Sequence, residues 1–308
     1  MTEPARLPAR PLMFGDVRAS SSVIGLGCSR LGSTLNAGGQ SEAARLVCRA
    51  LEIGVTLFDT ADIYGQGDSE RILGECLHGR RSDAILITKA GQRFSAVQRA
   101  AAMVKAPLRA AARVSPRLRN AISARRAGVL PRDLSAIHLR RALKASLKRL
   151  RTDYVDAFLL HSPDAGELAS RGDQLAELLD GLVRAGQTRF WGVSCDNVAS
   201  LEAALQMPGE VTVVQAPLQV LCSAGAVDHL AEIERRGIML LIRELGQFAG
   251  PLDDPAGRRA GIARTLSFAN AVALIGTTRI AHLDDAVATA LSLMPVQSAQ
   301  DQLVGAQA

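Results

Sequence analysis

Short apolar runs and amphipathic stretches alternate along the chain. Runs rich in Val, Ile and Leu occupy residues 21–27, 55–60, 84–90, 154–162, 188–194, 211–218, 238–245 and 271–278. The stretches between them repeat apolar residues every three or four positions, which is the spacing of a helix with one buried face. Continuous apolar runs are typical of parallel strands that are covered on both faces. Eight strand–helix units predict an α/β fold, a (β/α)8 TIM barrel that forms a single domain over residues 1–308.

Three segments fall outside this alternation. The residues before position 20 predict a short hairpin that closes the barrel bottom, and residues 295–308 predict a flexible tail. The connection after the third strand, residues 91–132, is oversized and contains ten basic residues but no acidic one. Connections of this length are usually lids or disordered segments. Two interpretations of this basic insertion stay open: a solvated surface segment, or a lid that closes over the substrate and attracts an anionic group.

Charge and composition narrow the choice of partners. The net charge of +6 comes from the basic insertion, because acidic residues outnumber basic ones elsewhere. This distribution argues against a nucleic-acid-binding face. No apolar run approaches the length of a membrane span, and the first residues have no signal-peptide pattern. The five cysteines are scattered, which fits reduced thiols and no zinc site. We therefore expect a cytoplasmic protein without a metal.

The glycine-rich segment GLGCSRLG, residues 25–32, follows the first strand and invites comparison with a Rossmann phosphate loop. Its glycines are spaced GxGxxxxG, and a further loop separates them from the next helix. The Rossmann fingerprint needs its glycines to open the helix, so that the helix N-terminus meets the pyrophosphate. The Rossmann interpretation is therefore disfavoured.

Polar side chains gather where the predicted strands end. Asp59 ends the second strand, Tyr64 lies just beyond it, Lys89 ends the third strand and His161 ends the fourth. In a barrel these positions share the rim that carries the active site. Each residue alone is most simply a solvated or structural one, and Asp62 is expected to cap the turn. Together, a lysine beside a tyrosine lowers the phenol pKa, and a carboxylate keeps that lysine charged. The set predicts a proton donor at a carbonyl.

Several motifs, in this order and spacing, resemble the aldo-keto reductase superfamily over essentially the whole chain. They are GLGCSRLG, LFDTADIYGQGDSERILGECL, ITKAG, SLKRLRTDYVDAFLLHSPD, GVSCDN and LIGTTRIAHLDDAV. The resemblance implies an NAD(P)H-dependent oxidoreductase that reduces an aldehyde or ketone, with NADPH bound across the barrel mouth and NADH as the other choice. It implies that Tyr64 is the proton donor and that Lys89 tunes it. Asp59 would pair with Lys89, and His161 would orient the carbonyl.

The same resemblance implies contacts with the cofactor. Ser194 and Gln215 match positions that hold the nicotinamide carboxamide, and residues 276–279 match the segment that grips the adenosine phosphate. The whole expected set is Cys28, Ser29, Ser194, Gln215, Arg243, Gly276, Thr277, Thr278, Arg279 and Asp285.

In or beside the expected cofactor-binding segments, the chain departs from the family pattern at four positions. Cys195 stands where Asn is common, and Arg243 or the neighbouring Glu244 stands where an aromatic residue often stacks on the nicotinamide. Ala286 replaces a frequent adenine-contacting Asn, and His282 replaces a frequent phosphate-binding Arg. Arg279 is therefore our candidate for the 2′-phosphate.

Three other functions stay open. A sugar or alcohol dehydrogenase using NAD would run the same reaction in reverse, and a non-catalytic regulatory subunit would keep only the cofactor. A serine hydrolase is disfavoured because the chain has no G-x-S-x-G elbow. We expect a small-molecule carbonyl substrate, no nucleic acid, no membrane and a monomer or weak homo-oligomer.

Overall fold

Each of the eight apolar runs forms one strand of a closed parallel barrel. The computed structural model describes residues 6–32, 39–93, 130–248 and 254–294. The strands are β3 Ile24–Gly27, β4 Leu57–Asp59, β5 Ile85–Ala90, β6 Val155–His161, β7 Thr188–Ser194, β8 Val213–Pro217, β9 Met239–Arg243 and β10 Ala271–Ile275. They close in the order β10-β3-β4-β5-β6-β7-β8-β9. The predicted (β/α)8 barrel is confirmed.

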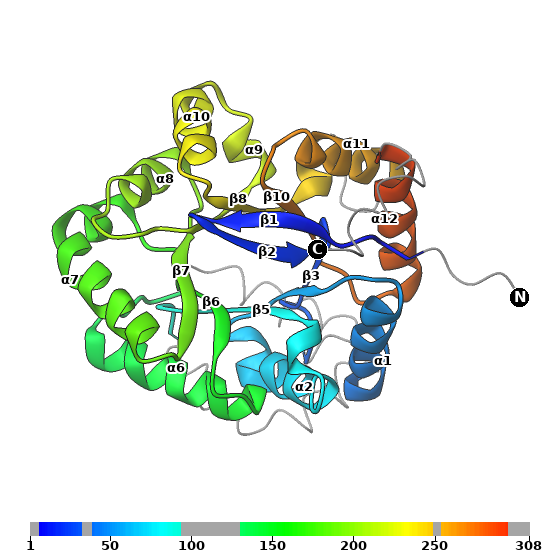
Figure 1. Cartoon of the computed structure of the whole chain (residues 1–308), viewed down its shortest axis with the longest axis horizontal. Coiled ribbons are helices and arrows are strands. Elements are labelled where there is room, and N and C mark those ends of the chain that lie inside the picture. The colour runs from blue at the N-terminus through cyan, green and yellow to red at the C-terminus, as the bar shows by residue number, and fades with distance from the viewer. Residues whose placement is uncertain (1–5, 33–38, 94–129, 249–253, 295–308) are drawn as a thin grey trace, which may run out of the picture.

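Helices follow the strands and surround the barrel (Figure 1). The longer ones are α1 Gly39–Glu52, α2 Asp68–Cys76, α6 Ala136–Leu150, α7 Ala165–Arg184, α8 Val198–Leu205, α10 Val227–Arg235, α11 Pro255–Leu266 and α12 Ile280–Leu293. Short turns of helix are η1 Tyr64–Gly67, η2 Arg81–Asp83, α9 Leu218–Leu221, η3 Ala224–Ala226 and η4 Leu245–Phe248. Polar caps start several helices, since Ser135, Asp164 and Asn197 each accept a backbone N–H of the first turn. Within the described ranges, no helix is both long and apolar enough to cross a bilayer.

The predicted N-terminal hairpin is present and covers the end of the barrel where the strands begin. It pairs β1 Arg10–Phe14 with β2 Val17–Ser21 and lies across the barrel in Figure 1. Phe14 stacks on Phe190 with 4.4 Å between ring centroids. Gly15 N–H also donates to Gly237 O at 3.1 Å. The hairpin therefore closes one end with apolar side chains, and the other end is left for polar ones.

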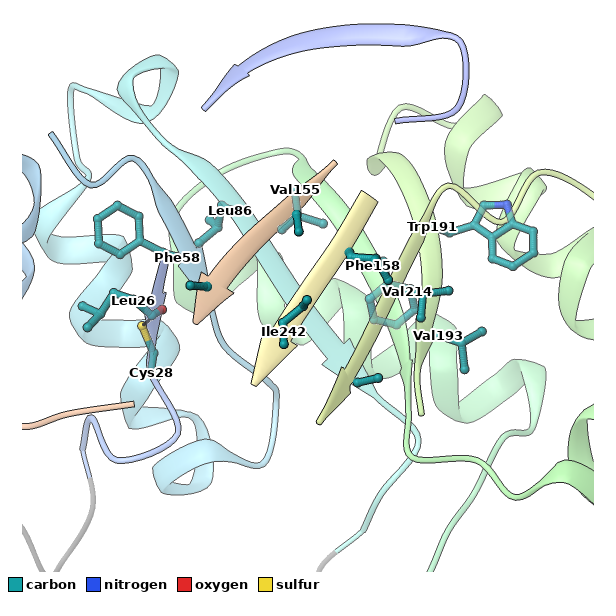
Figure 2. Close-up of a cluster of buried hydrophobic side chains, with 14 of the residues drawn as sticks. Leu26, Cys28, Phe58, Leu86, Val155, Phe158, Trp191, Val193, Val214 and Ile242 are labelled. Carbon is teal, nitrogen blue, oxygen red and sulfur yellow. Dashed lines mark hydrogen bonds between the residues drawn. The ribbon is translucent and has the colours of Figure 1, made fainter. Parts of the chain in front are cut away.

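Two apolar layers hold the barrel together. One layer fills the interior with residues such as Leu57 and Leu159, beneath the polar residues of the rim. The other lies between strands and helices and includes Leu86, Phe158 and Trp191 (Figure 2). Successive strand residues enter different layers because side chains alternate along a strand. Burying each such large apolar side chain stabilises the fold by roughly 1.5–3 kcal/mol.

The structure describes the two ends of the basic insertion, residues 91–93 and 130–132, which form its stem. Residues 94–129 lie outside the described ranges. Arg93 N–H donates to Pro131 O at 2.7 Å, which pairs the two arms of the stem. The stem cations have acidic partners: Arg93 pairs with Asp133 at 2.6 Å, and Arg132 pairs with Glu167 at 2.7 Å. The predicted lid and the predicted tail 295–308 both lie outside the described residues and stay predictions.

Candidate active site

The turn after β4 presents Tyr64 at the strand C-terminal rim. Three residues in a row have positive φ: Gly65 (58°), Gln66 (63°) and Gly67 (86°). Only glycine reaches this region without strain. At Gly67 there is also no room, because a Cβ would lie 2.7 Å from Cδ of Arg149. The glycines of the GQG sequence therefore allow the sharp turn that aims the phenol into the barrel mouth.

Lys89 lies directly beneath Tyr64 and is fully buried. Its Nζ lies 2.7 Å from Oδ1 of Asp59 and donates to Thr60 O at 2.8 Å. Nζ also lies 5.0 Å from the centre of the Tyr64 ring, and the Lys89 charge acts to lower the pKa of Tyr64. The neighbouring strands β4 and β5 thus provide the series Asp59–Lys89–Tyr64, in which a carboxylate holds the ammonium that faces the phenol.

A second series of hydrogen bonds crosses the barrel to the same carboxylate. Gln215 Nε2 donates to Asp59 Oδ1 at 2.9 Å, and Ser194 Oγ donates to Gln215 Oε1 at 2.9 Å. The strands that carry Gln215 and Asp59, β8 and β4, lie opposite each other in the strand order. Ser194 and Gln215 were predicted to hold a carboxamide. In this structure their polar atoms bind one another and orient Asp59, and the carboxamide contacts stay a prediction.

The pKa values of the buried groups differ from the sequence-based expectation at Tyr64. Burial raises the pKa of Tyr64 and outweighs the lowering effect of Lys89, with Asp59 adding to the rise. The prediction that Lys89 lowers the phenol pKa is therefore right about the contribution of Lys89 and wrong about the net direction. Burial alone would lower the pKa of Lys89, but Asp59 and Tyr64 together raise it. Both groups consequently hold their protons at neutral pH.

His161 packs edge-on against Tyr64, with 5.6 Å between ring centroids and 86° between the planes. Burial, together with the charges of Lys89 and Arg243, holds its pKa well below the ordinary value, so the imidazole is neutral. Nδ1 is buried without a partner among the described residues. A buried N–H without an acceptor is rarer than a buried lone pair without a donor, so the proton belongs on Nε2. His161 is then a neutral hydrogen-bond donor toward the cavity.

An ion pair on the helix side supports this arrangement. Glu70, at the start of α2, is fully buried and pairs with Nε of Arg149 at 2.5 Å. It also accepts the Thr88 hydroxyl at 2.7 Å, and Thr88 is the residue before Lys89. Glu70 therefore links the helix that follows the Tyr64 turn to the strand that carries Lys89.

One cavity of about 1030 Å³ joins these residues to the start of α12. Of the predicted site residues, those that line it are Ser29, Asp59, Tyr64, His161, Ser194, Gln215, Arg243, Gly276, Thr277, Thr278 and Arg279. Lys89 lies beneath its floor. The structure thus brings most of the predicted set to one continuous surface.

The far end of the cavity is cationic. Arg30, Arg258, Arg279 and His282 line it, and α12 begins there without a side-chain cap. Uncapped amides and the helix dipole favour an anion at such an end. The sequence interpretation missed Arg30 and Arg258. Arg30 lies inside the GLGCSRLG motif and could have been found there, whereas Arg258 sits in an amphipathic helix with no local signal.

Two predicted cofactor residues do not line the cavity. Cys28 is fully buried in the layer between strands and helices, and its thiol donates to Leu26 O at 3.3 Å. The alternation along β3 explains this, since Gly27 faces the cavity and its neighbours face the helices. Asp285 instead pairs with Arg258 at 3.3 Å. Neither side chain is placed as a direct cofactor contact.

Arg243 lies at the end of β9 and lines the cavity at the Tyr64 end, called the reacting end below, where its charge acts on Tyr64 and His161. Its guanidinium donates to Cys195 O at 3.2 Å and pairs with both Asp196 and Glu244. Glu244 adopts a φ of 61°, a strained value for a side-chain-bearing residue. The two carboxylates fix the guanidinium in place and offset its charge. No group of His, Cys, Asp or Glu in the described parts of the chain could hold a metal ion.

Comparisons with known proteins agree with this geometry. The family model described as the aldo/keto reductase family matches residues 23–243. The uncharacterized oxidoreductase YqkF of Bacillus subtilis is 31% identical over 173 residues, which cover 56% of this chain and 44% of that protein. The chain thus spans about half the length of the curated relatives that it matches.

Solved structures show the same fold at lower identity. An aldo-keto reductase of Bacillus halodurans in its holo form superposes with a TM-score of 0.69 at 21% identity, over 98% of this chain and 96% of that one. An aldo-keto reductase of Klebsiella pneumoniae in complex with NADPH gives a TM-score of 0.65 at 21% identity, over 96% and 93%. The family model covers more than half of the sequence, and the barrel matches these reductases. The chain belongs to the aldo/keto reductase family.

Proposed function

We propose that the protein is an NADPH-dependent reductase that converts an aldehyde or ketone to an alcohol, with Tyr64 as the proton donor. The observation that carries this proposal is one cavity with two distinct ends. Tyr64, supported by Lys89 and Asp59, stands at one end, and a cationic helix start with Arg279 stands at the other. A hydride donor with phosphate groups fits between them.

The residues of the cavity suit a nicotinamide dinucleotide phosphate. When bound, NADPH supplies the hydride. Arg30, Arg258 and Arg279 offer guanidinium groups, which hold phosphates bidentately, beside the uncapped amides of α12. Arg258 has a buried Nε without a partner among the described residues, so its donors are not all committed. The NADPH complex of the Klebsiella relative supports the choice of cofactor.

Tyr64 is the group at the reacting end that can release a proton toward a carbonyl oxygen. His161 is neutral and has no acidic proton to give, because burial and nearby cations hold its pKa low. Lys89 is covered completely and its raised pKa keeps its proton beside Asp59. The phenol remains protonated until the alkoxide forms, since its pKa lies above the ordinary value. Lys89 then stabilises the phenolate that remains.

In this proposal, His161 orients the substrate oxygen and Lys89 stabilises the charge on Tyr64. The Nε2–H of His161 donates to the substrate oxygen and places it beside the phenol hydroxyl. Preorganised donors in a buried site stabilise the developing charge more than mobile ones do. The ion pair of Lys89 with Asp59, which Gln215 also holds, keeps the ammonium from moving away.

The experiment that tests this function combines the wild-type protein with Tyr64→Phe. NADPH oxidation is followed by the nicotinamide absorbance with a panel of aldehydes and ketones. We expect turnover by the wild type and a loss of roughly 100-fold or more in kcat for Tyr64→Phe, because general acid catalysis contributes on that order. NADPH affinity should stay nearly unchanged, because the variant keeps the ring. Wild-type binding of NADPH without turnover would favour a regulatory subunit, and equal kcat for both proteins would exclude Tyr64 as the donor.

A further inference from the structure

Two cysteine side chains meet on the outside of the barrel, where α1 packs against α2. Cys48 lies on α1 and Cys76 is the last residue of α2. The Cys76 thiol lies 3.9 Å from the carbonyl oxygen of Ala44, one helical turn before Cys48 on the same face of α1. In the helix, Ala44 O accepts the N–H of Cys48, so the Cys76 thiol lies beside the backbone of Cys48. Cys48 also contributes to the raised pKa of the Cys76 thiol. Cys48 and Cys76, which are far apart in the sequence, are therefore neighbours where α1 packs against α2.

The two thiols differ in their access to solvent. Cys48 is exposed and Cys76 is half-buried, so a small oxidant can reach Cys48 first. Cys28 and Cys195 are fully buried, and the Cys222 sulfur accepts a hydrogen bond from Arg264. An oxidant or reductant in solution can therefore reach the thiols of this helix pair without entering the barrel.

We propose that Cys48 and Cys76 form a reversible disulfide that joins α1 to α2. The site is separate from the cavity, because neither residue lines it. The reaction is independent of the proposed reductase function. It makes this helix pair a site of oxidative modification by peroxides.

The chemistry with hydrogen peroxide is balanced in two steps. The Cys48 sulfur attacks one peroxide oxygen, an S–O bond forms, the O–O bond breaks, and the leaving hydroxide takes the thiol proton to become water. The Cys76 sulfur then attacks the Cys48 sulfur, an S–S bond forms and the S–O bond breaks, and the second hydroxide leaves as water with the proton of Cys76. Two thiols are oxidised by two electrons and one peroxide is reduced to two waters. Burial raises the pKa of Cys76 to about 11, which disfavours Cys76 as the thiol that attacks the peroxide first.

The cross-link should stabilise the fold and leave the active site open. It closes a loop of about 30 residues, and such a loop restricts the unfolded chain. Both cysteines lie in the later halves of their helices, whereas Tyr64 precedes the start of α2. For a chain of this size, we expect the oxidised protein to have a Tm higher by about 5 °C.

The experiment treats the full-length protein with hydrogen peroxide and then with dithiothreitol. Free thiols are titrated, the cross-linked peptides are identified by mass spectrometry without reduction, and Tm is measured in both states. Cys48→Ser and Cys76→Ser remove either partner, and Cys222→Ser is the matched control. We expect the wild type and Cys222→Ser to lose two thiols, gain the Cys48–Cys76 peptide and gain Tm, all reversed by dithiothreitol. Cys48→Ser and Cys76→Ser should show no Cys48–Cys76 peptide and no gain in Tm.

Three results would overturn the proposal. The first is a wild type that keeps both thiols under conditions that oxidise exposed cysteines. The second is the conversion of Cys48 to a sulfinic acid without any cross-linked peptide. The third is a disulfide between two chains in place of the link within one chain.

Discussion

Asp62 offers a sharp quantitative test, because this half-buried residue, two positions before Tyr64, has one carboxylate oxygen shielded from solvent. Its backbone N–H donates to Lys89 O at 3.0 Å, and its predicted role as a cap of the turn stays a prediction. Its Oδ1, however, is buried without a partner among the described residues. Burial is the main cause that raises the pKa of Asp62 from 3.8 to about 7, and the charge of Glu70 adds to it. Arg149 and Lys89 act in the opposite direction without cancelling the rise.

The raised pKa makes the stability of the fold depend on pH in a defined direction. The folded protein binds this proton more tightly than the unfolded chain, so the contribution of Asp62 is fully present below about pH 4. It is lost as pH rises toward 7. A shift of about three pKa units corresponds to about 4 kcal/mol over the whole range. About 3 kcal/mol of it falls between pH 5 and pH 8, because the unfolded carboxyl is already ionised at pH 5.

Replacing the carboxyl by an amide of the same shape should remove this pH dependence. Relative to the wild type, Asp62→Asn should therefore gain about 3 kcal/mol in the free energy of unfolding between pH 5 and pH 8. At this chain length the matching gain in Tm is about 5 °C. Exposed Asp173 lies on α7, and Asp173→Asn is the matched control that should follow the wild-type pH profile.

The assay is urea unfolding followed by the fluorescence of the single tryptophan, at several pH values. Trp191 is buried and its Nε1 donates to Asp180 at 2.7 Å, so unfolding changes its surroundings. Parallel stability curves for Asp62→Asn and the wild type from pH 5 to pH 8 would refute the reasoning. They would mean that the Asp62 carboxyl is solvated or finds a partner in solution.

The remaining predictions concern the ammonium and the cationic end. Lys89→Met should lower kcat severely and move the basic inflection of the pH–rate profile upward, because Tyr64 loses the charge that lowers its pKa; an unchanged inflection would exclude that coupling. The same variant should lower the stability by about 3–5 kcal/mol, measured by urea unfolding, since Asp59 is left as a buried unpaired carboxylate. Arg279→Ala should weaken NADPH binding roughly 10-fold or more and NADH binding much less, as a charge-assisted hydrogen bond to the 2′-phosphate is lost. Fluorescence titration measures both affinities, and equal weakening would place the 2′-phosphate at another residue, with Arg258→Ala as the next variant to test.

The fold could be predicted closely because burial acts on whole strands. The run 188–194 is β7 Thr188–Ser194 to the residue, and the run 84–90 differs from β5 Ile85–Ala90 only at its first position. Strands covered on both faces need continuous apolar residues, and that requirement is visible in any window of the sequence. The residues of the reacting end were visible for a related reason. Burying a polar side chain at the end of an apolar strand costs free energy unless the side chain has a hydrogen-bond partner. Asp59 and Lys89 are therefore easy to recognise among the apolar residues of their strands.

The pairing of polar atoms could not be predicted in the same way. The hydrogen bond from Gln215 to Asp59 joins strands on opposite sides of the barrel, and no spacing in the sequence records it. The net pKa direction of Tyr64 depends on how deeply the phenol is buried, a quantity that exists only once the barrel closes. Cys28 is different, because the alternation along β3 already assigns it to the helix side. The motif position was transferred without following the alternation, which places the Cys28 side chain away from the cavity.

The functional residues at one end of the cavity were easier to predict from the sequence than those at the other end. At the Tyr64 end, the proposed proton transfer requires particular groups at fixed distances, and the barrel rim supplies them from the ends of β4, β5 and β6. At the far end, an anion requires only positive charge and backbone amides, which Arg30, Arg258 and Arg279 provide from three different parts of the chain. Many arrangements of cations satisfy a phosphate, so no single residue type is dictated at a given position. The strand ends therefore carry the residues of the proposed reaction. In the same proposal, the choice between NADPH and NADH depends on which guanidinium groups reach the phosphate.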